Sequence, residues 1–425
     1  METIVVLILF LLTYYLIISG KFQRSLVAFT MGLLVMLLQI SDNISIKRVS
    51  SYVDFNTIGI LLGMMILVGI LKKTGMFQYI AAKIVKNSKG RMYLIYITLL
   101  IAVAFFSSIL DNVTTILLFS PVVFLIADTA GISPVSLIFS MIFAANIGGM
   151  TTIVGDPPNI LVGSASGASF VQFMLVMIVP SLLMFFGVFI YFHFRYPHIR
   201  QVETSKLQRL MDIDPKKAIE DRPLFIKGIV IFALVVLGFV VHEKLDYEAS
   251  LIALTGASVL MLLSRINFQE ISQEVEWDTI FFFVGLFTLA KALEVVGIIS
   301  TVANWINQFS TNPLLLILAV LWISAALGGF IGAVPVVTVF IPIIQRLQGM
   351  IPHGAELWWA LALGACIGGN MTISGAAANM VAVGLVEKTQ KTKISFVAFL
   401  KEGIVITFIG LLIATIYLVS RWYMI

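Results

Sequence analysis

The sequence predicts an all-α polytopic membrane protein built from two inverted repeats. Hydrophobic residues make up 60% of the 425-residue chain and charged residues only 12%, too few charges to cover a soluble protein of this length. Several apolar runs are long enough to cross a bilayer core of roughly 30 Å. Motifs of the first half also recur, in the same order, in the second half.

The first apolar run, residues 3–19, is expected to be a retained membrane helix. It has no basic start and no small-residue cleavage site, and further spans follow it. Lysines and arginines gather in residues 72–91 and 195–227, and the positive-inside bias places both segments on the cytoplasmic side. The formal net charge of +5 therefore reflects membrane topology, and nucleic-acid binding is not expected.

Few residues in the chain suit catalysis or metal binding. The single cysteine, Cys366, excludes an intrachain disulfide and a thiolate metal cage. The four histidines show no ligand spacing, and there is neither a phosphate-binding glycine loop nor a nucleophile–base–acid set. We therefore expect no metal, no cofactor and no enzymatic activity.

Four pairs of matching segments indicate an internal duplication, which is typical of secondary transporters. The pairs are VDFNTI and VEWDTI from Val53 and Val275, SPVV and IPII from Ser120 and Ile341, IGGMTTIVGDPPN and IGGNMTISGAAAN from Ile147 and Ile367, and SFVQF and SFVAF from Ser169 and Ser395. They divide the chain into N-terminal scaffold helices (1–52), repeat 1 (53–194), a charged cytoplasmic loop with linking spans (195–274) and repeat 2 (275–425).

Each repeat is expected to contain a re-entrant helical hairpin followed by a broken transmembrane helix. The hairpins are predicted at about 98–127 and 322–346, and the broken helices at about 135–167 and 358–387. In the first hairpin, apolar arms of about ten residues, or ~15 Å of helix, flank a polar tip. The tip would lie at mid-membrane depth, where non-helical backbone is tolerated only inside protein or against water. Its polar residues are Asp111, Asn112, Thr114 and Thr115.

The glycine-broken segments are the expected substrate- or ion-binding loops. Gly149 and Gly155 are expected to permit backbone turns closed to other residues, and close helix packing is the alternative explanation for these glycines. Freed carbonyls would suit a cation, whereas a half-helix beginning at Pro157 would suit an anion. The remaining site residues are Asn146, Thr151, Thr152 and Asn159 in the first half and Gly369, Asn370, Thr372, Ser374, Gly375 and Asn379 in the second.

Three charged residues fall within apolar surroundings. A carboxylate at the depth predicted for Asp111 costs roughly 2.5–3.5 kcal/mol, so a functional role is expected unless the tip is solvated. Asp156 is either a ligand or the cap of the half-helix that follows it. Lys291 lies fourteen residues after Trp277, about 21 Å along a helix, and is the candidate coupling residue. The alternative is a snorkelling lysine or one paired with Glu294.

The motifs LDNVTTILLFSPV, NIGGMTTIVGDPPN and GGNMTISGAAAN resemble the ion transporter superfamily, in particular its arsenite permease, P-protein and sodium/proton antiporter group with a citrate-transporter-like domain. The resemblance implies an elevator mechanism, with a scaffold and a moving transport domain, often in a homodimer. It assigns Asp111–Thr115 and Gly148–Asn159 to one half-site and Gly368–Asn379 to the other. The chain departs from the family pattern at Gly332 and Ala333, where relatives usually repeat the Asp-Asn pair. Lys291 is therefore hypothesised to replace a bound cation.

The expected function is secondary active transport across the cell membrane, with the lipid bilayer and a small solute as partners. The expected cargo is a small anion or oxyanion-type solute, such as arsenite, antimonite or a carboxylate. Proton coupling is favoured because the second Asp-Asn pair is missing. A sodium/proton antiporter and an anion channel of the P-protein type are the alternatives. A homodimer is expected, and the participation of an ATPase subunit is left open.

Overall fold

Helices form the regular secondary structure of the part of the chain that the computed structural model describes, residues 2–19, 21–207, 214–309, 312–390 and 393–424. Within these ranges eight helices are long and apolar enough to cross a membrane, and the bent pair α14–α15 would add a ninth. The prediction of an all-α, multi-pass membrane protein is confirmed.

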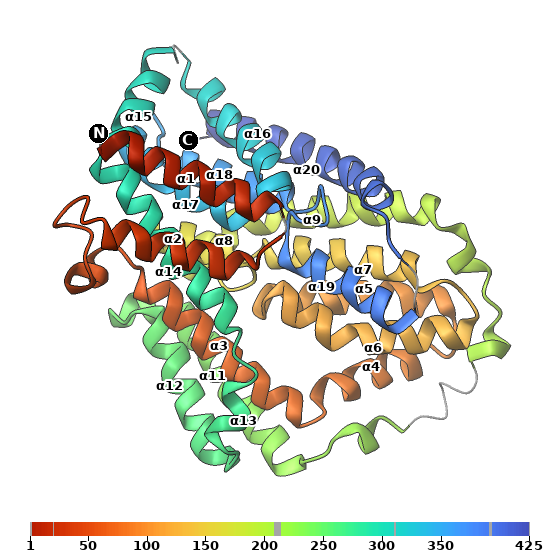
Figure 1. The fold of residues 1–425 in the computed structure, drawn as a ribbon. Coiled ribbons are helices and arrows are strands. Elements are labelled where there is room, and N and C mark those ends of the chain that lie inside the picture. The colour runs from red at the N-terminus through yellow and green to blue at the C-terminus, as the bar shows by residue number, and fades with distance from the viewer. Residues whose placement is uncertain (1, 20, 208–213, 310–311, 391–392, 425) are drawn as a thin grey trace.

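Two series of seven helices follow one another in matching order (Figure 1). Corresponding helices begin 220 to 226 residues apart, for example 222 for α3 and α14 (277 − 55) and 220 for α8 and α19 (377 − 157). The first series is α3 (Phe55–Lys73), α4 (Met76–Asn87), α5 (Met92–Ile109), α6 (Asn112–Ala130), α7 (Pro134–Gly149), α8 (Pro157–Ser166) and α9 (Phe170–Arg195). The second is α14 (Trp277–Val295), α15 (Ile298–Phe309), α16 (Pro313–Ile331), α17 (Ala333–Leu347), α18 (Glu356–Gly368), α19 (Ala377–Gln390) and α20 (Phe396–Met424).

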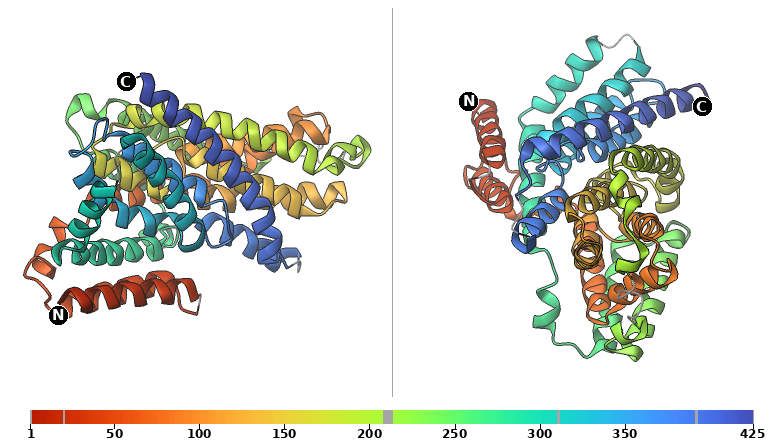
Figure 2. Two further views of the ribbon diagram at one scale, coloured as in Figure 1. Left: turned by 90° about the horizontal axis from the view of Figure 1, so that it is seen from above. Right: turned by 90° about the vertical axis from the view of Figure 1, so that its right-hand side faces the viewer.

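The first helix of each series packs with helices outside the series. These are α1 (Glu2–Ser19), α2 (Arg24–Leu37), α11 (Arg222–Val241), α12 (Ala249–Ser264) and α13 (Phe268–Ser272). We call them, together with α3 and α14, the flanking helices. Helix α14 packs along α2, and α3 packs along α12. In Figure 2 (right) α1 and α2 run along one edge of the molecule.

The hairpins and broken helices form the interior, and we call α5–α8 and α16–α19 the central helices. Within each half, the first hairpin arm packs on the first part of the broken helix, α5 on α7 and α16 on α18. Between the halves, the second hairpin arm packs on the second part of the other half's broken helix, α6 on α19 and α17 on α8. The two halves are therefore interlocked through these four helices.

Local sequence explains where the hairpins turn. Asp111 caps α6, since its carboxylate accepts bonds from the Thr114 amide (2.7 Å) and hydroxyl (2.5 Å). The second hairpin turns at Gly332, whose φ of 97° favours glycine. The arms are longer than expected: α5 and α6 have 18 and 19 residues instead of about ten, because the adjoining apolar residues continue both helices.

The glycines of the broken helices serve close packing. Gly148, Gly149, Gly155 and their counterparts at 368, 369 and 375 all lack a positive φ, so the expectation of special backbone turns is wrong. A Cβ atom on Gly148 would collide with the backbone of Ala104, and one on Gly368 with the backbone of Ala325. Each glycine lets the broken helix lie directly against the backbone of its hairpin.

We expect Gly148→Ala to destabilise the protein by about 2–3 kcal/mol, because the added methyl group meets backbone that cannot move aside. The measurement is thermal unfolding of the detergent-solubilised protein. Gly384→Ala is the matched control, since a Cβ atom there meets open space within helix α19. Equal melting temperatures for the two variants would contradict this account.

The basic segments lie together at one end of the molecule. Helix α4 packs against the short 3₁₀ helix η4 (Pro215–Ala218), so residues 72–91 and 215–218 share a face. At the same end Lys72 pairs with Glu274 (2.8 Å) and Lys73 with Glu270 (3.3 Å). From the positive-inside bias we predict that this face, where α3 ends and α14 begins, is the cytoplasmic one. The other 3₁₀ helices are η1 (Ile46–Ser51), η2 (Pro197–Gln201), η3 (Thr204–Leu207) and η5 (His242–Leu245).

Candidate functional site

An asparagine network joins the two broken helices where they are interrupted. Both amide hydrogens of Asn146 cross to the second half, donated to Asn370 Oδ1 (3.0 Å) and Asn379 Oδ1 (2.9 Å). Asn112, at the first hairpin tip, donates to Asn146 Oδ1 (3.2 Å). All four side chains are buried. The structure thus brings together residues that are more than 200 positions apart in sequence.

A second asparagine closes each break in the same way. Asn159 Nδ2 donates to the carbonyls of Gly149 (3.2 Å) and Thr152 (2.9 Å). Asn379 Nδ2 donates to Gly369 and Thr372, both at 2.8 Å. The carbonyls that were expected to attract a cation therefore accept side-chain amides. These asparagines hold the shape of each loop, and their oxygens accept bonds from the other half, Asn159 from Cys366 and Asn379 from Asn146.

The threonines and serine among the predicted site residues fix the framework. Thr152 donates to the Ser108 carbonyl and Thr372 to the Gly329 carbonyl, which ties each break to its own hairpin. Thr114 and Thr115 bond locally to Asp111, and Thr151 to the Ile147 carbonyl. Ser374 bonds to Thr372 and also donates to the Phe330 carbonyl on its hairpin (3.4 Å). Gly155 lies against Gly149, as Gly375 lies against Gly369, with no room for a side chain between them.

Cys366 occupies the position equivalent to Asn146, at an offset of 220 (366 − 146). Its thiol donates to Asn159 Oδ1 (3.2 Å), as Asn146 donates to Asn379 Oδ1. Each half thus donates an equivalent bond to the other half, as expected for two halves related by a two-fold axis. A thiol is a weaker donor than an amide, so the network is stronger on the Asn146 side.

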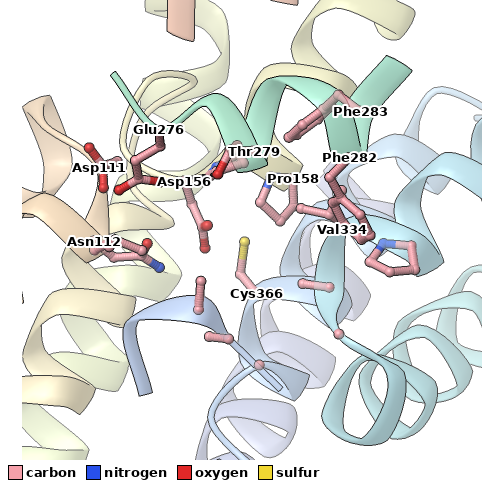
Figure 3. Close-up of a pocket in the computed structure, with 18 of the residues that line it drawn as sticks. Asp111, Asn112, Asp156, Pro158, Glu276, Thr279, Phe282, Phe283, Val334 and Cys366 are labelled. Atoms are coloured by element: carbon pink, nitrogen blue, oxygen red, sulfur yellow. Dashed lines mark hydrogen bonds between the residues drawn. The ribbon is translucent and has the colours of Figure 1, made fainter. Parts of the chain in front are cut away.

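A cavity of about 120 Å³ lies beside this network (Figure 3). Both hairpin tips, the starts of α8 and α14, and helix α2 contribute to its wall. Of the predicted site residues, the following line it: Asp111, Asn112, Asn146, Asp156, Gly369 and Gly375. The other predicted residues of the hairpin tips and helix breaks do not line it, and Thr151 lines a separate apolar cavity.

The cavity is also lined by charged residues that were not predicted from the sequence. Glu276, which precedes α14, and Arg24, on α2, both line it. The sequence did indicate Glu276, because the repeated motifs VDFNTI and VEWDTI each have an acid at their second position, Asp54 and Glu276. The repeat gave no indication of Arg24, since α2 lies outside the repeated series.

Three carboxylates and one guanidinium therefore face a single space. Asp156 stands at the N-cap position of α8 but makes no capping bond, so its carboxylate faces Cys366 and Asn112 across the cavity. Glu276 accepts a bond from Thr279 (3.0 Å), and Arg24 donates to the Ser374 carbonyl (3.2 Å). With all four groups ionised, the cavity wall carries a formal charge of −2.

Lys291 does not line this cavity. It faces a separate cavity of about 280 Å³ between the end of α14, α8 and α17. There it forms the expected pair with Glu294, three residues further along the same helix, at 3.1 Å. Its charge is thus partly neutralised before any solute arrives.

Apolar helices that cross a membrane and enclose a charged cavity between two helix breaks define a membrane transporter. A model of the citrate transporter family matches residues 14–364. The chain is 36% identical to an uncharacterized transporter of Mycobacterium tuberculosis over 99% of each chain. It is 29% identical to the P protein of Homo sapiens, covering 95% of this chain and 58% of that protein.

The chain belongs to the citrate transporter family. Its fold is similar to that of the YdaH transporter of Alcanivorax borkumensis, with a TM-score of 0.58 over 96% of this chain and 97% of that one. At 14% identity this similarity concerns the fold alone. The predicted resemblance to a group that has a citrate-transporter-like domain and includes the P protein is confirmed.

Proposed function

We propose that the protein is a proton-coupled secondary transporter of a small carboxylate or oxyanion. The observation that carries this proposal is the single cavity at the helix breaks, with Asp111, Asp156 and Glu276 facing Arg24. Fully ionised, this wall repels an anion. If the three acids were protonated, only Arg24 would remain charged and the wall would carry a net charge of +1. Proton binding and anion binding would therefore favour one another.

The same proposal includes an elevator mechanism with inverted repeats. The matching helix series and the exchanged Asn146 and Cys366 contacts support a two-fold relation between the halves. The central helices would form the moving domain, and the flanking helices the scaffold and the contact surface of a homodimer. Two similar halves of opposite orientation would give two conformations of opposite sidedness.

The test is uptake into proteoliposomes that contain the purified full-length chain. Radiolabelled citrate is offered with a pH gradient, with a sodium gradient and with neither, and arsenite is tested in parallel. We expect saturable uptake that depends on the pH gradient. Uptake of neither solute under any gradient would refute the proposal.

A sodium/proton antiporter is the second candidate, because three carboxylates in one cavity also suit cation exchange. Within the described residues, however, the acids do not form a cluster with the spacing of metal ligands. A pH-sensitive dye inside the vesicles distinguishes the two functions. A sodium pulse without citrate alkalinises or acidifies the lumen only if cations are exchanged directly.

Cys366 offers a native reporter of occupancy, since its thiol lines the cavity and it is the only cysteine of the chain. We expect saturating citrate at acidic pH to slow maleimide labelling of Cys366 about tenfold or more, because a bound solute occupies the space that the reagent must enter. Mass spectrometry of the intact protein measures the rate. Chloride at equal ionic strength is the control, and equal rates with citrate and chloride would contradict binding at this site.

A further inference from the structure

The Lys291 cavity continues the path of the first cavity along the same helices. Helices α8, α14 and α17 line both of them, while α3 lines the first and its N-cap residue Asp54 lines the second. On α8, α14 and α17 the last residue that lines the first cavity is one helical turn from the first residue that lines the second. These pairs are Pro158 and Leu161, Phe283 and Phe287, and Pro335 and Thr338. Along each helix axis the two linings are therefore about 5 Å apart.

The two central helices present the same face to both cavities. On α8, Pro157 and Pro158 line the first cavity, and the residues seven positions later, Ser164 and Ala165, line the second. On α17, Val334 and Pro335 line the first, and again seven positions later Ile341 and Pro342 line the second. Seven residues are two turns, so a slide of about 11 Å along the flanking helices would move one lining into the place of the other.

The flanking helices offer matched charges at the two positions. The first cavity has an acid from the repeat motif, Glu276, and the second has its counterpart Asp54, at an offset of 222 (276 − 54). Each cavity also has one basic residue, Arg24 in the first and Lys291 in the second, and the second has a further acid, Glu294, which pairs with Lys291. Glu276 lies at the basic, cytoplasmic end of the flanking helices, and Asp54 lies at the opposite end.

We propose that Asp54 and Lys291 form the scaffold half of a second solute-binding position, occupied in the alternate conformation. When the central helices move by two turns, the carboxylates of Asp111 and Asp156 face Asp54 and Lys291 instead of Glu276 and Arg24. The solute keeps the acid of the repeat motif and a cation beside it at both ends of its travel, and at the second position Glu294 is paired with that cation. This inference rests on the transporter proposed above and adds the residues that receive the solute on the far side.

Cysteine pairs in a Cys366→Ala background test the movement without any substrate. Val334→Cys with Thr279→Cys joins two residues of the first cavity, and Ile341→Cys with Ala290→Cys joins two of the second. Both pairs should react with a short bifunctional thiol reagent in the conformation described here. The decisive pair is Val334→Cys with Ala290→Cys, which lie on different cavities and come together only after the slide.

We expect the decisive pair to cross-link in membranes. Adding Lys291→Met should lower its cross-linked fraction about fivefold, because it removes the cation that faces the carboxylates of Asp111 and Asp156 in the alternate conformation. Adding Asp54→Asn should raise the fraction, because it removes a like charge beside those carboxylates. Asparagine caps a helix as well as aspartate does, so Asp54→Asn retains the bonds that Asp54 accepts from Asn56 and Thr57. Asp221→Asn, at the cap of α11 and outside both cavities, is the matched control.

Two results would overturn the inference. One is that the decisive pair fails to cross-link while both same-cavity pairs react. The other is that Asp54→Asn and Lys291→Met leave its cross-linked fraction unchanged, as the control does. A failure of citrate and arsenite uptake alone bears on the solute and not on this movement, so the two proposals fail separately.

Discussion

Replacing Asp156 by asparagine is expected to lower the steady-state accumulation of citrate about tenfold for each pH unit of gradient, since one pH unit is worth about 1.4 kcal/mol per proton. Asp156 is buried, makes no capping bond, and faces the cavity beside Asp111 and Glu276. Asparagine keeps the shape of the side chain but carries no proton through the cycle. Accumulation ratios in proteoliposomes, measured at several pH gradients, give the dependence.

Asp278→Asn is the matched control for this experiment. Asp278 lies two residues from Glu276 and binds Gln23 and Ser25, but it does not line the cavity. Its replacement should leave the accumulation ratio unchanged. A wild-type dependence on the pH gradient in Asp156→Asn would exclude this carboxylate from coupling.

Asn146→Ala is expected to cause the largest loss of stability among the site variants. The change removes the donor to two buried oxygens, those of Asn370 and Asn379, and the acceptor of Asn112. Leaving a buried polar group without its partner costs about 1–3 kcal/mol. We therefore expect a melting temperature lower by roughly 10 °C, together with loss of transport.

Cys366→Ala supplies the comparison, because Cys366 holds the equivalent position and makes one weak bond, to Asn159. Its melting temperature should fall by only about 2 °C. Tryptophan fluorescence of the detergent-solubilised proteins measures both transitions. Similar melting temperatures for the two variants would mean that the asparagine network does not hold the halves together.

Much of the architecture was predictable because its signals are local. The two hairpins and two broken helices fall near their expected residues, since glycine, proline and polar side chains interrupt apolar runs in a way that any helix must follow. The lengths of the hairpin arms were underestimated, because hydropathy alone does not show where a buried helix ends. The role of the glycines was predicted wrongly. They make room for the backbone of another helix, which is close in space but distant in sequence.

The site was only partly predictable. Asp111, Asn112, Asn146 and Asp156 were expected and do line the cavity. Asn159 and Asn379 were expected as ligands, but their amides close the loops. The orientation of an amide depends on which carbonyls surround it after folding, and no sequence pattern specifies this.

By itself the sequence determined the membrane location, the helix order of the two halves and the places where helices break, because hydropathy and backbone restrictions act on each segment separately. Only the tertiary structure decided that Arg24 and Glu276 face Asp111, and that Lys291 faces a different cavity. Those relations depend on how helices from remote segments pack against one another. A shift of one helical turn in that packing would give each cavity a different set of charges.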